Sequence, residues 1–228
     1  MLDWNIHKNI LLQILKAIYD DTSIGPLLGF KGGTAAHFLY KLSRLSVDLD
    51  FDLLDPDKAD YVFGKMKSLL AELGKLSDQQ QKRYTLLFVV AYPEGKVKIE
   101  INLRAFGSQF ELRNYLGIPL LVMTREDMFA HKLAALLDRK KTANRDIFDL
   151  WFFLYHRWPL NSKILEQRTG MPSGKYFRQC IAFVEKLNER RLLSGVGELL
   201  DEKQKNWARA NLKKDVLFLF KARLDSKI

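Results

Sequence analysis

The sequence lacks the cysteine pairs that stabilise small secreted proteins and the long apolar runs that span membranes. It contains one cysteine, Cys180, which cannot form an internal disulfide, so a disulfide scaffold is excluded. No apolar run approaches the roughly 18 residues that a membrane span needs. The first ten residues also lack the basic start and continuous apolar stretch of a signal peptide. We therefore expect a cytoplasmic protein that has no membrane partner.

Internal repeats, low-complexity segments and Pro/Gly-rich linkers are missing as well. Apolar residues make up 47% of the 228 residues and charged residues 28%, which is ordinary for a globular protein. A chain of this length can bury most of the surface that it exposes when unfolded. Disorder throughout is therefore excluded, and the length allows one large domain or two small ones.

Positive charge is concentrated in the last third of the chain. The net charge is +10, of which residues 1–154 contribute +2 and residues 155–228 contribute +8. A basic region favours polyanions, and nucleic acid is the first candidate. The alternative is a solvated helical surface with no such partner.

Hydrophobic periodicity divides the chain near residue 124. Alternating and β-branched segments predict strands, and a 3.6-residue period predicts helices. In the first part we expect strands at 26–30, 47–54, 84–92, 97–103 and 120–123, and helices at 4–19, 34–42 and 56–73. In the second part we expect only helices, at 125–137, 144–155, 175–190 and 203–224. The prediction is an α+β protein with an αβ domain over 1–123 packed closely on a helical domain over 124–228.

The sharpest feature is a segment that alternates acidic and apolar residues, from Ser46 to Asp52. Alternate side chains on a strand share a face, so Asp48, Asp50 and Asp52 are expected on one face and apolar residues on the other. Three neighbouring like charges repel one another, and a cation among them removes the repulsion. Mg²⁺ suits this role, since it takes one or two carboxylates together with water and phosphate oxygens. The alternative is an exposed edge strand that carries charges against aggregation.

Two glycines lie between a predicted strand and a predicted helix, in Lys31-Gly32-Gly33-Thr34. Glycines let the backbone approach an anion closely, and the N–H groups of the following helix then point at it. Thr34 is expected to be the N-cap of that helix. The alternative is an ordinary tight turn.

Glu100 lies between apolar neighbours on a later predicted strand. If that strand runs beside the acidic one, Glu100 completes a site of three carboxylates. Such a site can hold two metal ions that clamp the attacking and leaving oxygens of phosphoryl transfer. The alternative is a strand glutamate paired with Lys98 or Lys96.

These motifs, in this order, resemble the nucleotidyltransferase superfamily of DNA polymerase β-like fold, and more closely the AbiEii/AbiGii-type nucleotidyltransferase toxins, which include the MenT group. That family typically reads Lys-Gly-Gly-Thr and then Arg-x-Ser-x-Asp-x-Asp-Phe-Asp, which residues 31–34 and 44–52 match. A helix with a lysine and Ala-Leu-Leu-x-Arg follows, and then Arg-Asp-x-x-Asp-Leu, which residues 132–139 and 145–150 match. The resemblance covers about residues 27–155.

The resemblance implies a mixed-sheet, polymerase β-like first half and a role for each matched residue. Asp48 and Asp50 are the implied metal ligands, and Glu100 stands where the third carboxylate is expected, at a position where many relatives carry Asp. Lys132 would neutralise the triphosphate, and Asp146 would be the late active-site acid. The residues implied to bind the nucleotide are Lys31, Gly32, Gly33, Thr34, Arg44, Ser46 and Lys132.

The residues of the second block also have plain structural interpretations. On a helix, Lys132, Leu136 and Arg139 share a face. Asn144 can cap the next helix, and Asp146 in its first turn complements the helix dipole. Lys132 can be a solvated lysine.

The implied activity is transfer of a nucleoside monophosphate from an NTP to an RNA, with Mg²⁺ as cofactor, two metal ions in the site and pyrophosphate as the leaving group. The resemblance suggests the tRNA 3′ end as acceptor, and a toxin of a toxin–antitoxin or phage-defence pair with a separately encoded antitoxin. The helical half would complete the active site and carry the basic surface.

Three alternatives stay open at this point. The first is a nucleotidyltransferase for a small molecule such as an antibiotic, although pockets for cationic aminoglycosides tend to be acidic and the last third of this chain is basic. The second is a catalytically inactive module of the same fold that binds RNA or nucleotide. The third is a kinase-like transfer of the γ-phosphate.

Overall fold

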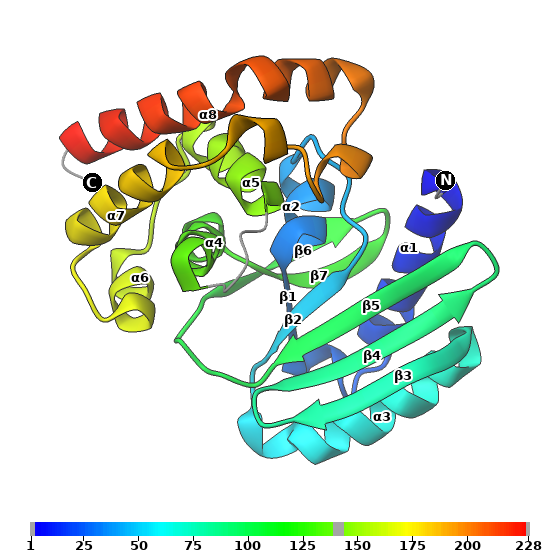
Figure 1. The fold of residues 1–228 in the computed structure, drawn as a ribbon. Helices are drawn as coiled ribbons and strands as arrows, with labels where there is room; N and C mark the ends of the chain where they lie inside the picture. The colour runs from blue at the N-terminus through cyan, green and yellow to red at the C-terminus, as the bar shows by residue number, and fades with distance from the viewer. Residues whose placement is uncertain (1–2, 139–143, 227–228) are drawn as a thin grey trace. The chain divides into compact units, whose positions relative to one another are not determined.

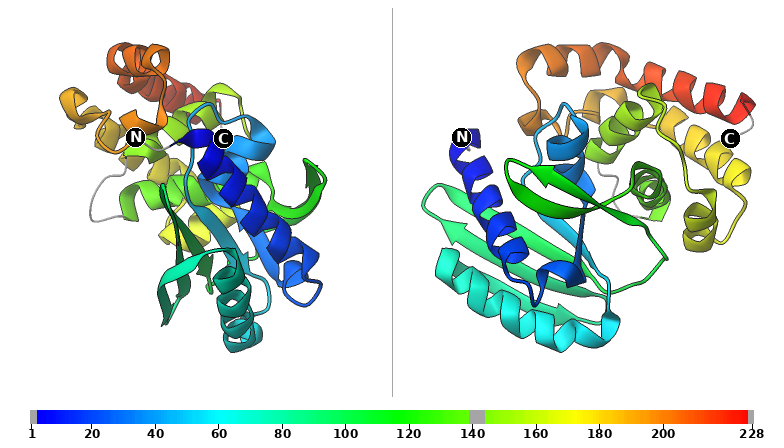
Figure 2. Two further views of the ribbon diagram at one scale, coloured as in Figure 1. Left: turned by 90° about the vertical axis from the view of Figure 1, so that its right-hand side faces the viewer. Right: turned by 180° about the vertical axis from the view of Figure 1, so that it is seen from behind.

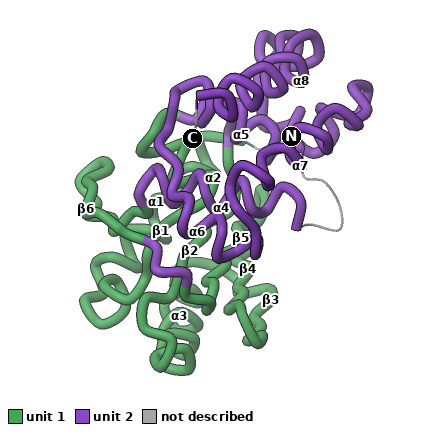
Figure 3. Tube along the Cα trace, turned by 90° about the vertical axis from the view of Figure 1, so that its left-hand side faces the viewer, with its two compact units in different colours: residues 1–41, 46–105, 109–123 green, residues 42–45, 106–108, 124–228 purple. Residues whose placement is uncertain are grey.

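The computed structural model describes residues 3–138 and 144–226, and the chain folds into two compact units, which Figure 3 colours separately. Unit 1 comprises residues 1–41, 46–105 and 109–123. Unit 2 comprises residues 42–45, 106–108 and 124–228. The last boundary between the units, after Met123, falls where the hydrophobic period changes.

Unit 1 is built on a mixed sheet whose strand order is β3-β4-β5-β2-β1-β7-β6 (Figure 1). Strand β2 pairs antiparallel with β1 and parallel with β5, while β1 pairs parallel with β7. The acidic strand β2 is therefore central in the sheet. The strands are β1 (Leu28–Lys31), β2 (Leu49–Leu53), β3 (Lys75–Lys82), β4 (Thr85–Tyr92), β5 (Gly95–Asn102), β6 (Phe110–Tyr115) and β7 (Ile118–Met123).

Helices α1 (Trp4–Asp20) and α3 (Ala59–Leu73) contact each other and pack on one face of this sheet, as Figure 2 shows from behind. Along β4 and β5 every second residue is buried, because one side of each strand faces these helices. The other side carries Lys98, Glu100 and Asn102. The apolar core thus lies on one face, and the polar residues of β5 lie on the opposite one.

The remaining short elements of unit 1 correct several expected boundaries. Helix α2 (Gly32–Tyr40) begins two residues before Thr34, and β2 begins at Leu49, so Asp48 immediately precedes the strand. A short 3₁₀ turn (Pro56–Lys58) precedes α3, and another (Gly25–Leu27) precedes β1. Strands β3 and β6 were not predicted, because both are edge strands rich in polar residues and lack an alternating apolar pattern.

Unit 2 is helical in its described part, as the sequence predicted. Helices α5 and α8 pack together, α4 contacts α5, α6 and α7, and α7 contacts α8. One helix, α6, was not predicted, because its eight residues include only two buried apolar ones. The helices are α4 (Arg125–Asp138), α5 (Asn144–Tyr155), α6 (Ser162–Thr169), α7 (Ser173–Glu185) and α8 (Glu202–Asp225), with 3₁₀ turns at Glu189–Arg191 and Gly197–Leu199.

The segment 42–45 belongs to unit 2 through backbone contacts. The N–H of Leu45 donates to the carbonyl of Leu199 at 2.9 Å. The side-chain amide of Gln204 donates to the backbone carbonyl of Ser43 at 2.9 Å. Gln204 also completes a capping box with Asp201 at the start of α8. The start of the Arg-x-Ser-x-Asp motif therefore folds with the helical unit, and its aspartates fold with the sheet.

No helix in the part of the chain that the structure describes is long and apolar enough to cross a membrane.

Candidate functional site

Two carboxylates lie opposite each other on neighbouring central strands of unit 1. The parallel pairing of β2 with β5 sets Asp50 beside Glu100 and Asp52 beside Asn102. Both pairs are on the sheet face opposite the core helices, because their neighbours Phe51 and Ile101 are fully buried. The strand that carries Glu100 therefore runs beside the acidic strand, as a site that combines these carboxylates requires.

The turn before α2 touches Asp50 directly. Lys31 pairs with Asp50 across the antiparallel strands, so the chain enters α2 beside that carboxylate. Gly32 has φ +80°, and a Cβ at this position would lie 2.3 Å from Oδ2 of Asp50. Glycine is needed here both for its left-handed backbone and for the approach of the carboxylate. The turn is thus shaped by its fit to Asp50.

Thr34 has a different role from the expected one. Helix α2 begins at Gly32, with Lys31 as an N-cap that makes no side-chain capping bond, so the predicted Thr34 cap is wrong. Thr34 is instead buried in the first turn, where its hydroxyl donates to the carbonyl of Asp48. The hydroxyl thereby holds the backbone that presents Asp48, and the backbone N–H groups of this turn are those that an anion would use.

Asp52 is a structural residue of the sheet. The residue is 7% exposed, and its carboxylate accepts hydrogen bonds from Lys31 Nζ and, at 2.7 Å, from the side-chain amide of Asn102. Because β2 is central, the interpretation of the acidic strand as an exposed edge is wrong. The protein neutralises the third aspartate of the strand with its own lysine and needs no added cation for it.

Lys98 lies between two of the predicted metal ligands. Its Nζ is 3.6 Å from Oδ2 of Asp48 and 3.4 Å from Oε1 of Glu100. The pairing of Glu100 with a strand lysine, which the sequence left open, is therefore present. Within the described residues no group of three or more His, Cys, Asp and Glu side chains is arranged to hold a metal ion.

His7 supports the same site from helix α1. Its Nε2 donates to the carbonyl of Val47 at 3.0 Å, because a carbonyl can only accept, and its Nδ1 accepts from the hydroxyl of Tyr92 at 2.6 Å. Burial lowers the pKa of His7, so the neutral ring with this tautomer is favoured. The residue before Asp48 is thus held by a histidine that sequence reasoning had not singled out.

A second charged cluster lies inside unit 2. The guanidinium of Arg44 binds the carboxylate of Asp149 at two points, with Nε–Oδ1 of 2.5 Å and Nη2–Oδ2 of 2.7 Å. Lys132 Nζ lies 2.9 Å from oxygens of both Asp146 and Asp149. Arg44, Asp146 and Asp149 are at most 2% exposed. Two cations and two carboxylates are therefore combined in one buried network.

The charges of this network stabilise one another. Burial disfavours the ionised form of Asp149, but Arg44 and Lys132 outweigh it and lower the pKa of its carboxyl to about 2. Burial likewise disfavours the charged form of Lys132, but Asp146 and Asp149 outweigh it and raise the pKa of its ammonium. Both side chains are therefore charged at neutral pH.

The structure gathers the predicted residues into these two clusters. Asp48, Asp50, Glu100 and the Gly-Gly turn belong to unit 1, and Ser46, 8% exposed, precedes them there. Lys132, Asp146 and Arg44 belong to unit 2. The structure shows Arg44 in an ion pair with Asp149, and its role in binding the nucleotide stays a prediction. Arg139 of the quoted motif lies outside the described residues. Sequence reasoning assigned no role to Asp149, although Asp149 is the second aspartate of the matched Arg-Asp-x-x-Asp-Leu motif.

Comparisons with known proteins concern the family and the fold of the chain. A family model described as "Nucleotidyl transferase AbiEii toxin, Type IV TA system" matches residues 13–213. A candidate nucleotidyltransferase from H. pylori superposes with a TM-score of 0.60 at 21% identity, covering 98% of this chain and 97% of that one. JHP933 from Helicobacter pylori gives 0.56 at 19% identity, over 100% and 98% of the two chains. No curated protein matches significantly. At such identities the structural likeness shows the fold alone, and it confirms the predicted nucleotidyltransferase-type α+β fold.

Proposed function

The chain belongs to the AbiEii family of nucleotidyl transferase toxins of type IV TA systems, and on that premise we propose that it transfers a nucleoside monophosphate from an NTP to an RNA acceptor. The observation that carries the proposal is the pairing of Asp50 with Glu100 beside the Gly32 turn. Carboxylates and helix N–H groups are the two kinds of group that a nucleoside triphosphate and its cation require.

The residues of unit 1 fit a magnesium ion that takes only two carboxylates from the protein. Asp48 and Asp50 would hold it, and water and substrate phosphate oxygens would be its other ligands, which is the usual way Mg²⁺ binds beside phosphates. When bound, the ion would neutralise charge that develops on the α-phosphate. A second ion shared with Glu100 stays a prediction, since the described carboxylates form no ready three-ligand group.

In the proposed reaction the chain mainly positions charge. The first turn of α2 offers its N–H groups to the phosphates, and the absence of a Cβ on Gly32 leaves room for Asp50 beside that turn. The oxygen of the acceptor hydroxyl forms a bond to the α-phosphorus, the bond to the bridging oxygen breaks, and pyrophosphate leaves. Glu100 receives the hydroxyl proton. Positioning and electrostatics supply most of the rate in such transfers.

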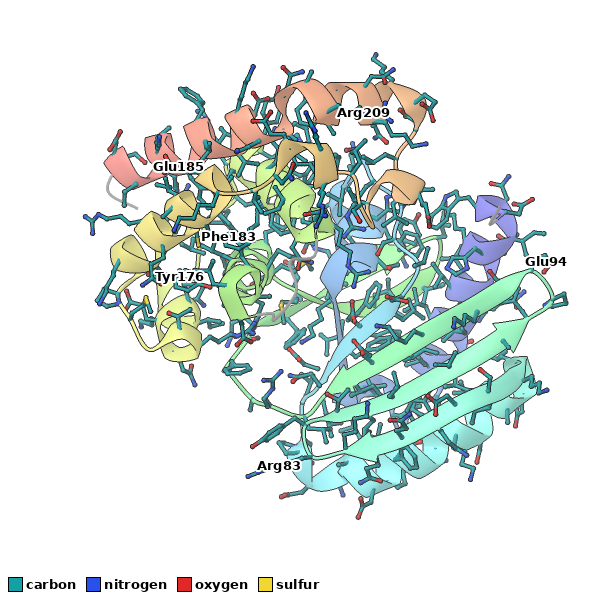
Figure 4. All side chains as sticks on the ribbon, in the orientation of Figure 1. Arg83, Glu94, Tyr176, Phe183, Glu185 and Arg209 are labelled. Atoms are coloured by element: carbon teal, nitrogen blue, oxygen red, sulfur yellow. The ribbon has the colours of Figure 1, made fainter. Side chains whose placement is uncertain are left out.

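The choice of RNA as acceptor rests on charge. The last third of the chain carries +8, and its longest helix, α8, bears much of it. Figure 4 labels Arg209 on this helix. The basic residues of α8 are Lys203, Lys205, Arg209, Lys213, Lys214, Lys221 and Arg223. Lysine and arginine clusters bind phosphate backbones in a salt-dependent way. The tRNA 3′ end is the acceptor that we propose within this class.

A type IV TA family implies a separate antitoxin as partner. We propose that toxin and antitoxin both work in the cytoplasm, where NTPs and tRNA are present.

The test is a labelling assay with the full chain. Purified protein is incubated with Mg²⁺, total tRNA and each NTP labelled at the α-phosphate. We expect label in RNA with one preferred NTP, lost in Asp50→Asn and retained in Asp57→Asn, which makes the same change at an exposed aspartate.

Each other outcome selects a different function. Label in an added aminoglycoside, but not in RNA, would establish the small-molecule reaction instead. Transfer of γ-label to an acceptor would establish a kinase-like reaction. RNA binding that is equal with and without metal, and no transfer of either label, would establish an inactive binding module.

Lys98→Met is expected to tighten metal binding. The ammonium of Lys98 lies between Asp48 and Glu100, where it competes with an added cation and repels it. Two unit charges about 4 Å apart interact by roughly 1 kcal/mol even in bulk water, so removing one of them should change the binding constant of a cation by at least about 5-fold. Titration calorimetry of the NTP-free protein with Mn²⁺ measures this change apart from catalysis.

Lys96→Met is the matched control, because Lys96 is exposed and lies on the same face of β5, two residues away. Its removal changes the net charge equally but leaves the Asp48–Lys98–Glu100 arrangement in place. Equal dissociation constants for the two variants would mean that Lys98 exerts only a general charge effect.

A further inference from the structure

An exposed aromatic ring with two guanidinium groups lies in unit 1 at the turn between strands β3 and β4, beside the end of β5. Tyr84 is 47% exposed and immediately precedes β4. The guanidinium carbon of Arg83 is 5.0 Å from the centre of its ring, and that of Arg104 is 5.7 Å away. Figure 4 labels Arg83 at this turn. We call Arg83, Tyr84 and Arg104 the stacking cluster.

The stacking cluster is connected to the acidic strand by hydrogen bonds. Arg104 Nε donates to the side-chain oxygen of Asn102 at 3.1 Å, and the amide of Asn102 donates to the carboxylate of Asp52 at 2.7 Å. The N–H of Leu103 donates to the carbonyl of Tyr84 at 3.0 Å, which holds the tyrosine beside the end of β5. The position of the cluster on the sheet is therefore fixed relative to Asp50 and Glu100.

The spacing along β5 suits a polynucleotide. Asn102 is two residues beyond Glu100 on the same strand face, and Arg104 is two residues further. At about 3.3 Å per residue, Tyr84, which lies level with Leu103, is roughly 10 Å along the strand direction from the carboxylate pair, and Arg104 is roughly 13 Å away. An extended RNA strand that reacts at Glu100 would therefore reach Tyr84 within a few nucleotides.

We propose that the stacking cluster binds the unpaired end of the acceptor RNA, an inference that rests on the proposed nucleotidyl transfer to RNA. One base stacks on the ring of Tyr84 in place of the Arg83 guanidinium, which moves to the neighbouring phosphate, while Arg104 is held by Asn102. Aromatic rings and guanidinium planes are the usual platforms for unstacked bases. The exposed ring and the two cations match a base and its two flanking phosphates, and this match tolerates any base sequence.

The test measures binding of an unpaired, fluorescently labelled RNA oligonucleotide to the full chain by anisotropy. Tyr84→Ala should weaken binding on the order of 10-fold, as expected when one stacked base is lost. Tyr84→Trp should retain it, because tryptophan also stacks. Arg83→Gln should lower the salt dependence of log K by about one phosphate contact. The affinity for NTP should be the same in all variants.

The matched control is Tyr61→Ala. Tyr61 lies on α3, is 44% exposed and has Lys65 Nζ 5.9 Å from its ring centre, so it resembles Tyr84 in exposure and in its neighbouring cation. If Tyr84→Ala weakens RNA binding no more than Tyr61→Ala, the stacking cluster is not the site, and the proposed function still stands. If the wild type binds no RNA, the choice of RNA as acceptor fails and this inference fails with it.

Discussion

Asp50→Asn should abolish nucleotidyl transfer and at the same time make the metal-free protein slightly more stable. Asp50 lies directly opposite Glu100 on the neighbouring parallel strand and touches the Gly32 turn. Two like charges opposite each other in a sheet destabilise it by a few tenths of a kcal/mol to about 1 kcal/mol. Replacing one carboxylate by an amide removes this repulsion and also removes a charge on which the proposed reaction depends.

The expected loss of activity is about 1,000-fold, the upper end of what one preorganised electrostatic group contributes. The expected gain in melting temperature is about 1–3 °C for a chain of this size. The rate is measured with α-labelled NTP and the stability by thermal unfolding without metal. Opposite signs for activity and stability are typical of a residue kept for function.

Asp52→Asn is the informative comparison, because it makes the same change two residues further along the same strand. Asp52 is buried and accepts from Lys31 and Asn102, so its loss should lower the free energy of unfolding by about 1–3 kcal/mol. If Asp50→Asn proves as destabilising as Asp52→Asn, Asp50 is a structural residue of the sheet. If Asp50→Asn retains near wild-type transfer, the proposed site is wrong.

The sequence alone could predict only part of the difference between Asp50 and Asp52. Alternation correctly indicated that Asp50 and Asp52 share a strand face, since alternation depends only on the local backbone. It could not show that Lys31 neutralises Asp52, because that depends on the antiparallel pairing of β1 with β2. Nor could it place Glu100 beside Asp50, because β2 and β5 are about fifty residues apart in the chain.

Elements with strong apolar periods were predicted well, and those without them were missed. Helices α1 and α5 agree with their predicted ranges to within one residue, because each buries a regular apolar face. Strand β3 consists largely of polar residues, and only its pairing with β4 makes it a strand. The N-cap assigned to Thr34 failed for a related reason, because its hydroxyl found a tertiary partner, the carbonyl of Asp48.

The largest effect on stability is expected from Asp149→Ala in unit 2. Asp149 is fully buried and binds the Arg44 guanidinium at two points, and Arg44 is itself 2% exposed. Removing one partner of a buried ion pair leaves the other charge with too little compensation, which typically costs 3–5 kcal/mol. No sequence pattern predicted this pair, because 105 residues separate its members.

The pH dependence of stability provides a second measurement of the same network. The pKa of Asp149 is about 2 in the folded chain, below its ordinary value near 3.9, so the folded state resists protonation more than the unfolded state does. The resulting stabilisation is complete above about pH 5 and is lost as the pH falls toward 2. Asp149→Asn cannot titrate, so its urea midpoint should fall less than that of the wild type between pH 5 and pH 3.

Asp138→Asn is the control for both measurements, because it removes a carboxylate from an exposed position at the end of α4. Its urea midpoint should stay close to that of the wild type at pH 7 and should fall with acid as the wild type does. A wild-type pH profile in Asp149→Asn would mean that other carboxylates cause the acid sensitivity. A loss below about 1 kcal/mol in Asp149→Ala would mean that Arg44 finds other partners and that the buried pair contributes little to stability.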